Sequence, residues 1–168
     1  MSTQGRLFAR YLDDLPAGQL EWIGLRPARK MPMLVEQQVE ALATFGLKGD
    51  RRCEATPGSA RQVTIISVEY IDIIQRLLKR DDITPDLLRR NLVVSGINLT
   101  ALRHQRFQIG EQAIFEATAL CHPCRRMELA LGKGGVAAML GHGGLCAKIL
   151  KSGTVSVGDP VIHLGPAA

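Results

Sequence analysis

The sequence predicts an α+β fold in which β-structure predominates and only a few short helices occur. Three observations support this expectation. Short β-branched segments recur through the second half of the chain, glycine-containing turns separate them, and strong helical periodicity is confined to one central segment. Strands this short and closely spaced are typical of a barrel or a sandwich. The 168 residues contain no internal repeat or linker, so we expect residues 1–168 to form a single domain.

The first half of the chain mixes strands and helices. Residues 19–25 predict a strand, residues 39–45 a short helix that ends at Gly46, and residues 49–60 an exposed loop. A β-branched strand at 61–67 leads into the clearest helix, residues 67–80, which Ser67 can cap. A second short helix begins at Thr84, because Pro85 is tolerated in a first helical turn.

The second half of the chain reads as strands joined by turns. Turns are expected at Ser152-Gly153 and Gly158-Asp159. The expected strands are Leu92–Val94, Arg106–Ile109, Gln112–Leu120, Leu145–Leu150 and Pro160–Leu164.

The net charge of +5 allows an anionic partner, but its distribution limits which kind. The basic residues form scattered pairs and aromatic residues make up only 4%, which argues against a nucleic-acid surface. Separate arginine pairs suit a small phosphorylated ligand, because guanidinium binds phosphate oxygens bidentately, although such pairs also occur as plain solvated surface.

The sequence also favours a cytoplasmic protein without membrane association. No apolar run reaches the roughly 18 residues that a membrane span needs. The N-terminus lacks the apolar region of a secretion signal. Four cysteines in a chain of this length do not make a disulfide scaffold, which points to a reducing compartment.

The segment Cys121-His122-Pro123-Cys124 is the most informative motif, because a thiolate can act as a soft-metal ligand, a nucleophile or a sulfur carrier. One interpretation is thiol redox chemistry between Cys121 and Cys124. Thioredoxin-like domains, however, place this motif early, and only 44 residues follow Cys124 here.

A second interpretation is a structural zinc site. The spacing of Cys121, Cys124, His142 and Cys146 is permitted for a Cys₃His tetrahedron. The glycines around His142 and a core large enough to fold without metal argue against it, and free cysteine is often simply a small buried side chain.

In the third interpretation Cys124 acts alone. The alternation of residues 112–120, continued by one step, places Cys121 on the inner face with Ala119 as a packing residue. Pro123 then turns the chain and leaves Cys124 near an opening, where the guanidinium of Arg125 favours its thiolate form.

Five blocks of the sequence resemble the MOSC domain, and they occur in that family's order over about residues 20–164. The blocks are Gly46–Arg51, Arg61–Thr64, Leu88–Leu99, Cys121–Cys124 and Gly153–Val161. MOSC domains occur in molybdenum-cofactor sulfurases, in the mitochondrial amidoxime-reducing component and as stand-alone bacterial proteins.

The resemblance implies a closed or partly closed β-barrel that binds molybdenum cofactor (molybdopterin). The family's cysteine ligates molybdenum in the amidoxime-reducing relatives, and the sulfurase domain carries sulfur or binds the cofactor. The second cysteine of the pair matches it, so the resemblance implies these roles for Cys124. Soft thiolate suits such a metal. The resemblance places the remaining cofactor contacts at Arg89, Asn91, Arg61, His122 and Arg51.

We therefore expect an oxidoreductase that acts on N-hydroxylated or similar small substrates and draws electrons from a separate reductase, because no nucleotide-binding glycine motif occurs. The alternative from the same resemblance is a sulfur-carrier or cofactor-delivery module, in which a sulfur-donating protein loads Cys124 with a persulfide. The zinc-structured binding module is the third hypothesis.

Overall fold

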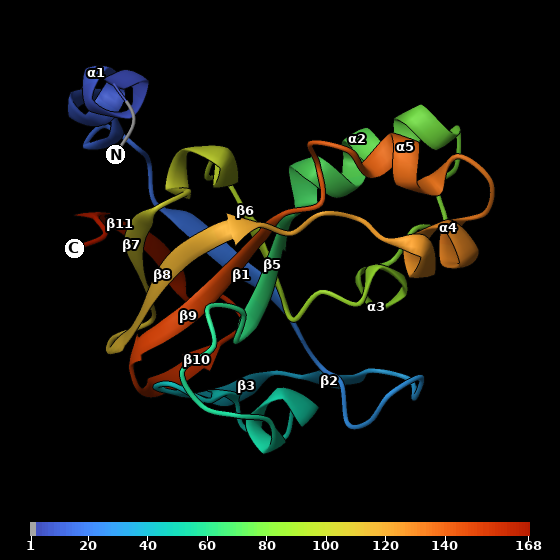
Figure 1. Ribbon diagram of the computed structural model, residues 1–168, viewed down its shortest axis with the longest axis horizontal. Helices are drawn as coiled ribbons and strands as arrows, with labels where there is room; N and C mark the ends of the chain where they lie inside the picture. Colours follow the sequence, from blue (N-terminus) through green and yellow to red (C-terminus); the bar gives the residue numbers. More distant parts are fainter. Residues whose placement is uncertain (1–2) are drawn as a thin grey trace.

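The computed structural model, which describes residues 3–168, contains a closed β-barrel (Figure 1). Seven strands form the ring, and the last strand pairs with both the first strand and β7, which closes it. Every neighbouring pair is antiparallel except β5 and β6. In ring order the strands are β1 (Gly18–Leu25), β11 (Pro160–Pro166), β7 (Gln105–Ile109), β8 (Ala113–Leu120), β9 (Leu145–Lys151), β5 (Val63–Ser67) and β6 (Leu92–Ser95).

A second, three-stranded sheet lies against one end of the barrel (Figure 1). It contains β10 (Gly153–Ser156), β3 (Gln38–Leu42) and β4 (Gly46–Leu47). The short strand β2 (Leu34–Glu36) extends the main sheet beside β1. The 3₁₀ helix η1 (Arg51–Glu54) follows β4, so the small sheet carries the basic segment that contributes to the site described below.

The barrel is filled by apolar side chains from alternate positions of its strands. Phe107 and Phe115 stack with their ring centroids 5.4 Å apart, and Leu20 and Ile23 are fully buried. Residues of β5 and β6 with the opposite parity, Ile66 among them, point outward into a second apolar cluster.

Helices cover that outward face of β5 and β6. They are α2 (Val68–Leu78), α3 (Pro85–Leu88), α4 (Arg125–Leu131) and α5 (Gly135–Met139). Ile71, Ile74, Leu88 and Met127 pack with Ile66 in the second cluster. Figure 1 shows the four helices together on one side of the barrel. They hold the end of β8 and the start of β9 beside the barrel wall, where the cysteines lie.

The predicted fold class is confirmed, and most of the predicted elements are found. The strands expected in the second half match β6, β7, β8, β9 and β11 within two residues. The central helix begins as expected, because the Ser67 side chain accepts a hydrogen bond from the Tyr70 amide at 3.1 Å. The loop predicted at 49–60 contains η1.

The helix predicted at residues 39–45 is wrong. Residues 38–42 form strand β3, in which Val39 and Ala41 are buried while Gln38 and Glu40 are exposed. The strand forms because it pairs with β10, whose first residue, Gly153, was predicted to lie in a turn. Pairing between distant segments outweighs the weak local preference for helix.

The helix α1 (Thr3–Leu12) was not expected from the sequence. It projects from the body of the molecule (Figure 1), and its Leu7, Phe8 and Tyr11 side chains are exposed. Among the described residues, no helix is long and apolar enough to cross a membrane.

Candidate functional site

Five arginines line a cavity of about 610 Å³ beside the barrel wall, which we call the arginine cavity. The loop after β1 and helix η1 form one side, and strands β5, β8 and β9 form the other. Glu54 is the one acidic side chain among the described residues that line it. The charged, polar and sulfur-containing side chains that line the cavity include Arg26, Arg29, Arg51, Arg52, Arg61, Thr64, Cys121 and Cys146.

Arg26 is held in the cavity wall by Asp50. Its Nε and Nη2 atoms donate to the two carboxylate oxygens of Asp50, each at 3.0 Å, and its backbone amide donates to the same group at 2.9 Å. Asp50 is only 2% exposed. Burial raises the pKa of Asp50, but the hydrogen bonds and positive charge of Arg26 outweigh burial and hold this pKa below its ordinary value.

Asn91 connects this ion pair to the barrel. Its side-chain oxygen accepts hydrogen bonds from Arg26 Nη2 and from the Thr64 hydroxyl, each at 3.2 Å. Its amide nitrogen donates to Asp50 at 2.9 Å and to the Gly24 carbonyl at 3.0 Å. Asn91 is fully buried, so it lies behind the cavity wall and positions Arg26 and Asp50.

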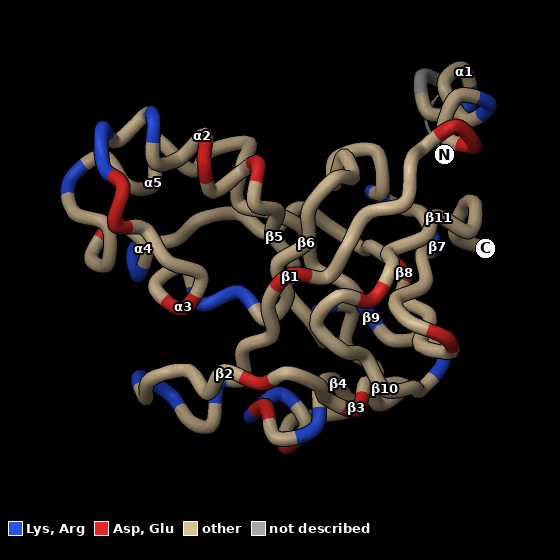
Figure 2. The backbone as a smooth tube through the Cα atoms, turned by 180° about the vertical axis from the view of Figure 1, so that it is seen from behind, with Lys and Arg blue, Asp and Glu red and all other residues tan. Residues whose placement is uncertain are grey.

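Further guanidiniums gather where α3 and α4 approach the cavity. Burial lowers the pKa of Arg89, and so do the positive charges of its neighbours Arg126, Arg26 and Arg51. The Arg89 Nη1 atom donates to the Met31 carbonyl at 2.8 Å. Figure 2 shows the basic segment that follows α3 facing the basic segments of the β1–β2 loop and of η1. The cluster is therefore strongly cationic and continuous with the cavity through Arg26 and Arg51.

Two of these basic side chains have donor capacity to spare. Within residues 3–168, the buried Nε atoms of Arg52 and Arg89 have no hydrogen-bond partner. Buried donors are nearly always satisfied in native proteins, so unpaired guanidinium nitrogens beside a cavity favour an anionic ligand.

Cys121 lies on the cavity, and not on the inner face of the barrel that the alternation had predicted. A register shift between Ala117 and Ala119 in the pairing of β8 with β9 changes which residues point inward. Ala117 is in the barrel core, and after the shift Leu120 packs against that core. Cys121 therefore faces outward, into the cavity, with Cys146.

The Cys121 thiol is the most acidic of the cysteines with a perturbed pKa. A hydrogen bond from Cys146 lowers the pKa of Cys121 to about 6, against the opposing effect of burial, and three positive charges contribute, those of Arg90, Arg61 and Arg26. The same hydrogen bond, together with burial, raises the pKa of Cys146.

Cys124 is exposed and occupies the N-cap position of α4. It is outside the lining of the arginine cavity, but Arg126, two residues further on, belongs to the cationic cluster around Arg89. A ligand that extended from the cavity toward this cluster would approach the start of α4.

The structure does not assemble the predicted zinc tetrahedron. His142 packs its ring edge against Tyr70, with the centroids 5.6 Å apart. No group of three or more His, Cys, Asp or Glu side chains suited to a metal ion occurs within residues 3–168. Cys121 and Cys146 instead line the arginine cavity together.

The predicted site residues fall into three places. Arg51 and Arg61 line the arginine cavity, Arg89 stands in the adjoining cluster, and Asn91 lies behind the wall. His122 is exposed and lines a small neighbouring pocket with Cys121. Cys124 is exposed at the start of α4.

Sequence reasoning missed Arg26, Asp50 and Arg90 as parts of the site, and it considered Cys146 only as a possible zinc ligand with Cys121. Asp50 stands in the Gly-Asp-Arg block and Arg90 in the Arg-Arg-Asn block, so both are adjacent to predicted site residues. No local signal marked Arg26, because only the folded chain brings it to the cavity.

Comparisons with known proteins agree with this architecture. A structure of the YuaD protein from Bacillus subtilis superimposes with a TM-score of 0.75 at 20% identity, covering 89% of this chain and 97% of that chain. YiiM from Geobacillus stearothermophilus gives 0.70 at 12% identity over 88% of this chain and 75% of that one. YiiM from Escherichia coli gives 0.67 at 16% identity, over 89% and 71%.

At these identities the superpositions establish the fold alone. No curated protein matches the sequence significantly. The MOSC domain model matches residues 51–162, which contain η1, the Arg89–Asn91 segment, both paired cysteines and Cys124. The match covers about two thirds of the sequence, and the chain therefore belongs to the MOSC domain family.

Proposed function

We propose that the chain binds molybdenum cofactor in the arginine cavity, with Cys124 as the thiolate ligand of molybdenum. The observation that carries this proposal is the cavity itself: five arginines face one acidic side chain beside the Cys121–Cys124 segment, in a chain of the MOSC family. A phosphorylated pterin is an anion of the size and chemistry that such a cavity recognises.

The residues present fit this cofactor in both charge and donor type. The unpaired Nε atoms of Arg52 and Arg89 can donate to phosphate or pterin oxygens. Arg51 and Arg61 line the cavity without a carboxylate partner among the described salt bridges. Asp50 neutralises Arg26, so four lining arginines remain to balance a phosphate and Glu54.

Each part of the site has a distinct role in this proposal. Arg51 and Arg61 bind the phosphate group, and Arg89 and Arg126 attract the anion toward α4. Asn91 and Asp50 fix the orientation of Arg26. Cys124 is exposed and can reach a metal without displacing packed side chains. The bound molybdenum supplies two-electron redox chemistry, and the protein residues bind and orient.

The substrate class proposed is small N-hydroxylated compounds, and the electrons come from a separate reductase in the cytoplasm. The cavity of about 610 Å³ lies in the range of small-molecule sites, which limits the substrate that could share it with a cofactor.

Metal content tests the proposal. The wild-type chain, Cys124→Ser and Cys121→Ser are purified from a host that makes molybdenum cofactor, and molybdenum and released pterin are measured per chain. We expect molybdenum in the wild type, its loss in Cys124→Ser and its retention in Cys121→Ser. Absence of both molybdenum and pterin from well-folded wild-type protein would overturn the proposal.

Activity is then measured on the loaded wild type with an amidoxime and a chemically reduced dye as electron donor. Reduction of the amidoxime, lost in Cys124→Ser, is the expected result. Stoichiometric cofactor without such reduction would restrict the function to binding or delivery.

The exposure of Cys124 favours a second candidate, a sulfur carrier that exchanges sulfur with a partner protein. An exposed thiol at the start of a helix, next to Arg125, is accessible to another protein and favours an anionic persulfide. Intact-mass analysis of protein incubated with a sulfur donor would show one added sulfur on Cys124 in metal-free protein. Failure of Cys124 to accept sulfur would exclude this candidate.

A further inference from the structure

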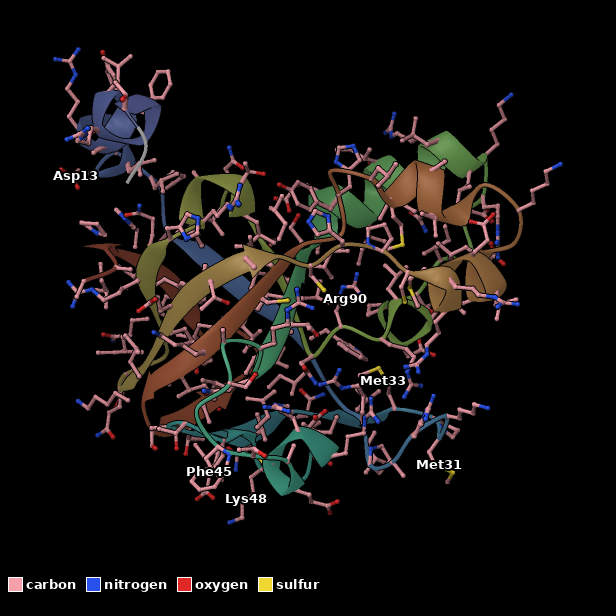
Figure 3. The ribbon with its side chains drawn as sticks, in the orientation of Figure 1. Asp13, Met31, Met33, Phe45, Lys48 and Arg90 are labelled. Carbon is pink, nitrogen blue, oxygen red and sulfur yellow. The ribbon has the colours of Figure 1, made fainter. Side chains whose placement is uncertain are left out.

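Arg90 is a buried cation for which residues 3–168 supply no carboxylate partner. Only 6% of the residue is exposed. Its Nε donates to the Gly143 carbonyl and its Nη1 to the Leu88 carbonyl, each at 2.9 Å, while Nη2 has no partner within residues 3–168. Figure 3 places Arg90 between the barrel and the helices. A buried guanidinium is costly unless an anion compensates its charge.

Cys121 lies close to Arg90. Arg90 is the first of the cationic groups that act on the Cys121 thiol, followed by Arg61 and Arg26. The Cys121 amide donates to the Gly144 carbonyl at 2.8 Å, which places Cys121 next to the glycine that Arg90 binds. The positive charge of Arg90 therefore favours the thiolate form of Cys121.

Cys146 completes a dithiol site. It lies on β9, where it pairs with Ala119 of β8, while Cys121 follows the last residue of β8, so the two cysteines are neighbours across adjacent segments. Both residues line the arginine cavity, and both cysteines are free. Two free cysteines that share one cavity wall are the arrangement of a reduced redox pair, in which one sulfur attacks and the other resolves.

We propose that Cys121 and Cys146 are a redox-active pair that hydrogen peroxide converts to a disulfide in the wall of the arginine cavity. The Cys121 thiolate attacks one peroxide oxygen, the O–O bond breaks, and hydroxide leaves and takes from solvent the proton that the Cys121 thiol had released, so that Cys121 carries a sulfenic acid. The Cys146 sulfur then attacks the Cys121 sulfur. An S–S bond forms, the S–O bond breaks, and the leaving hydroxyl takes the Cys146 proton as water.

The balance is two thiols and one peroxide giving one disulfide and two waters. This pairing differs from the Cys121–Cys124 redox interpretation of the sequence, and it concerns a cysteine pair that the proposed metal ligand does not include. The disulfide between Cys121 and Cys146 can therefore be tested independently of cofactor binding.

Peptide mapping after peroxide treatment is the direct test, carried out on the full-length protein without cofactor. Protein treated with hydrogen peroxide is alkylated, digested without reductant and analysed by mass spectrometry. We expect a peptide in which Cys121 is linked to Cys146, reversed by dithiothreitol. In Cys146→Ser, Cys121 should instead remain as a sulfenic acid that a dimedone probe captures. A Cys121–Cys124 link, or no link while Cys121 stays unmodified, would overturn the proposal.

The pH dependence of alkylation tests the thiolate separately from the disulfide. At pH 7 a thiol with a pKa near 6 is about 90% ionised, roughly thirtyfold more than an ordinary cysteine. Because nucleophilicity falls with pKa, the net gain in rate is only about threefold. The pH at which the alkylation rate reaches half its maximum is therefore a more sensitive measurement than the rate at pH 7. We expect the midpoint for Cys121 near pH 6 and that for Cys53, whose pKa is raised by burial, well above it.

Variants of Arg90 and Cys146 identify the groups that set this midpoint. The groups facing the Cys121 thiol are Cys146, Arg90, Arg61 and Arg26. Cys146→Ala and Arg90→Gln should each move the midpoint upward, whereas Arg90→Lys, which keeps the charge, should move it less. Cys146→Ala leaves the Arg90 contacts intact, so it serves if Arg90→Gln fails to fold. A Cys121 midpoint above pH 8 in the wild type would contradict the thiolate.

Discussion

At the scale of single residues, the site depends on polar groups that are buried together. Arg26, Asp50 and Asn91 come from three segments, and each satisfies the hydrogen-bonding groups of the other two. Removing one member of such a group leaves the others buried without partners, which costs more than the bonds contribute.

Asp50→Asn should lower the free energy of unfolding by about 3 kcal/mol at pH 7, because it leaves Arg26 without its counterion. The matched control is Asp72→Asn, which removes an exposed ion pair with Arg76 and should cost less than about 0.5 kcal/mol. Urea unfolding followed by circular dichroism measures both values. Equal effects of the two substitutions would contradict the role of Asp50.

The contribution of Asp50 should also depend on pH. The pKa of Asp50 in the folded chain lies below its value in the unfolded chain, which is about 3.9. Its stabilisation is therefore fully present above pH ~4 and is lost as the pH falls through the folded value. The difference in unfolding free energy between the wild type and Asp50→Asn should narrow below pH ~4. A difference that stays constant down to pH ~2.5 would show that the carboxylate charge is not responsible.

At the scale of secondary-structure elements, the turn between α5 and β9 fixes the cysteine pair. A Cβ added at Gly143 would lie 2.1 Å from the Cys121 carbonyl oxygen, so the backbones of the two segments touch there. Gly141 differs: its φ of +82° disfavours other residues, but nothing lies within 4 Å of an added Cβ. Substitution of Gly143 therefore tests the steric contact with Cys121, and substitution of Gly141 tests the left-handed backbone conformation alone.

Gly143→Ala should destabilise the protein by about 3 kcal/mol or more, because the segments that carry Cys121 and Arg90 must move apart. Gly141→Ala should cost about 1 kcal/mol through its left-handed backbone alone. Thermal unfolding gives the stabilities, and the alkylation midpoint of Cys121 should rise only in Gly143→Ala. An unchanged midpoint in a stable Gly143→Ala variant would mean that this contact does not position the thiolate.

The elements also show what the sequence could predict. The strands and the central helix could be predicted from local periodicity. Their apolar faces pack into the two apolar clusters, as the alternation of apolar and polar residues indicates. The prediction for residues 39–45 was wrong because β10, the partner of strand β3, begins in a predicted turn. The predicted inward orientation of Cys121 was wrong because of the register shift between Ala117 and Ala119. Such a shift is a property of two paired strands, and the pattern of one strand does not record it.

At the scale of the whole molecule, closure of the barrel brings the arginines together. β1, β5 and β6 carry Arg26, Thr64 and Asn91 to one end, while the small sheet delivers Arg51 on η1. These residues are up to 65 positions apart in hydrogen-bonded pairs, so only the resemblance to MOSC domains could group Arg51, Arg61, Arg89 and Asn91 beforehand. Arg26 entered the site through topology alone.

We propose that the arginine cavity binds an anionic cofactor. The most direct measurement is the pterin retained per chain by the wild type, by Arg51→Gln/Arg61→Gln and by the control Arg6→Gln/Arg10→Gln, whose exposed arginines lie on α1. All three proteins are purified from a cofactor-producing host and dialysed equally. The cavity variant and the control lose the same net charge.

Loss of two charged contacts worth about 1.5 kcal/mol each should weaken binding roughly a hundredfold in the cavity variant. The wild type and the control should then retain pterin after dialysis, and the cavity variant should not. Equal retention in a well-folded cavity variant would place the cofactor elsewhere and contradict the account.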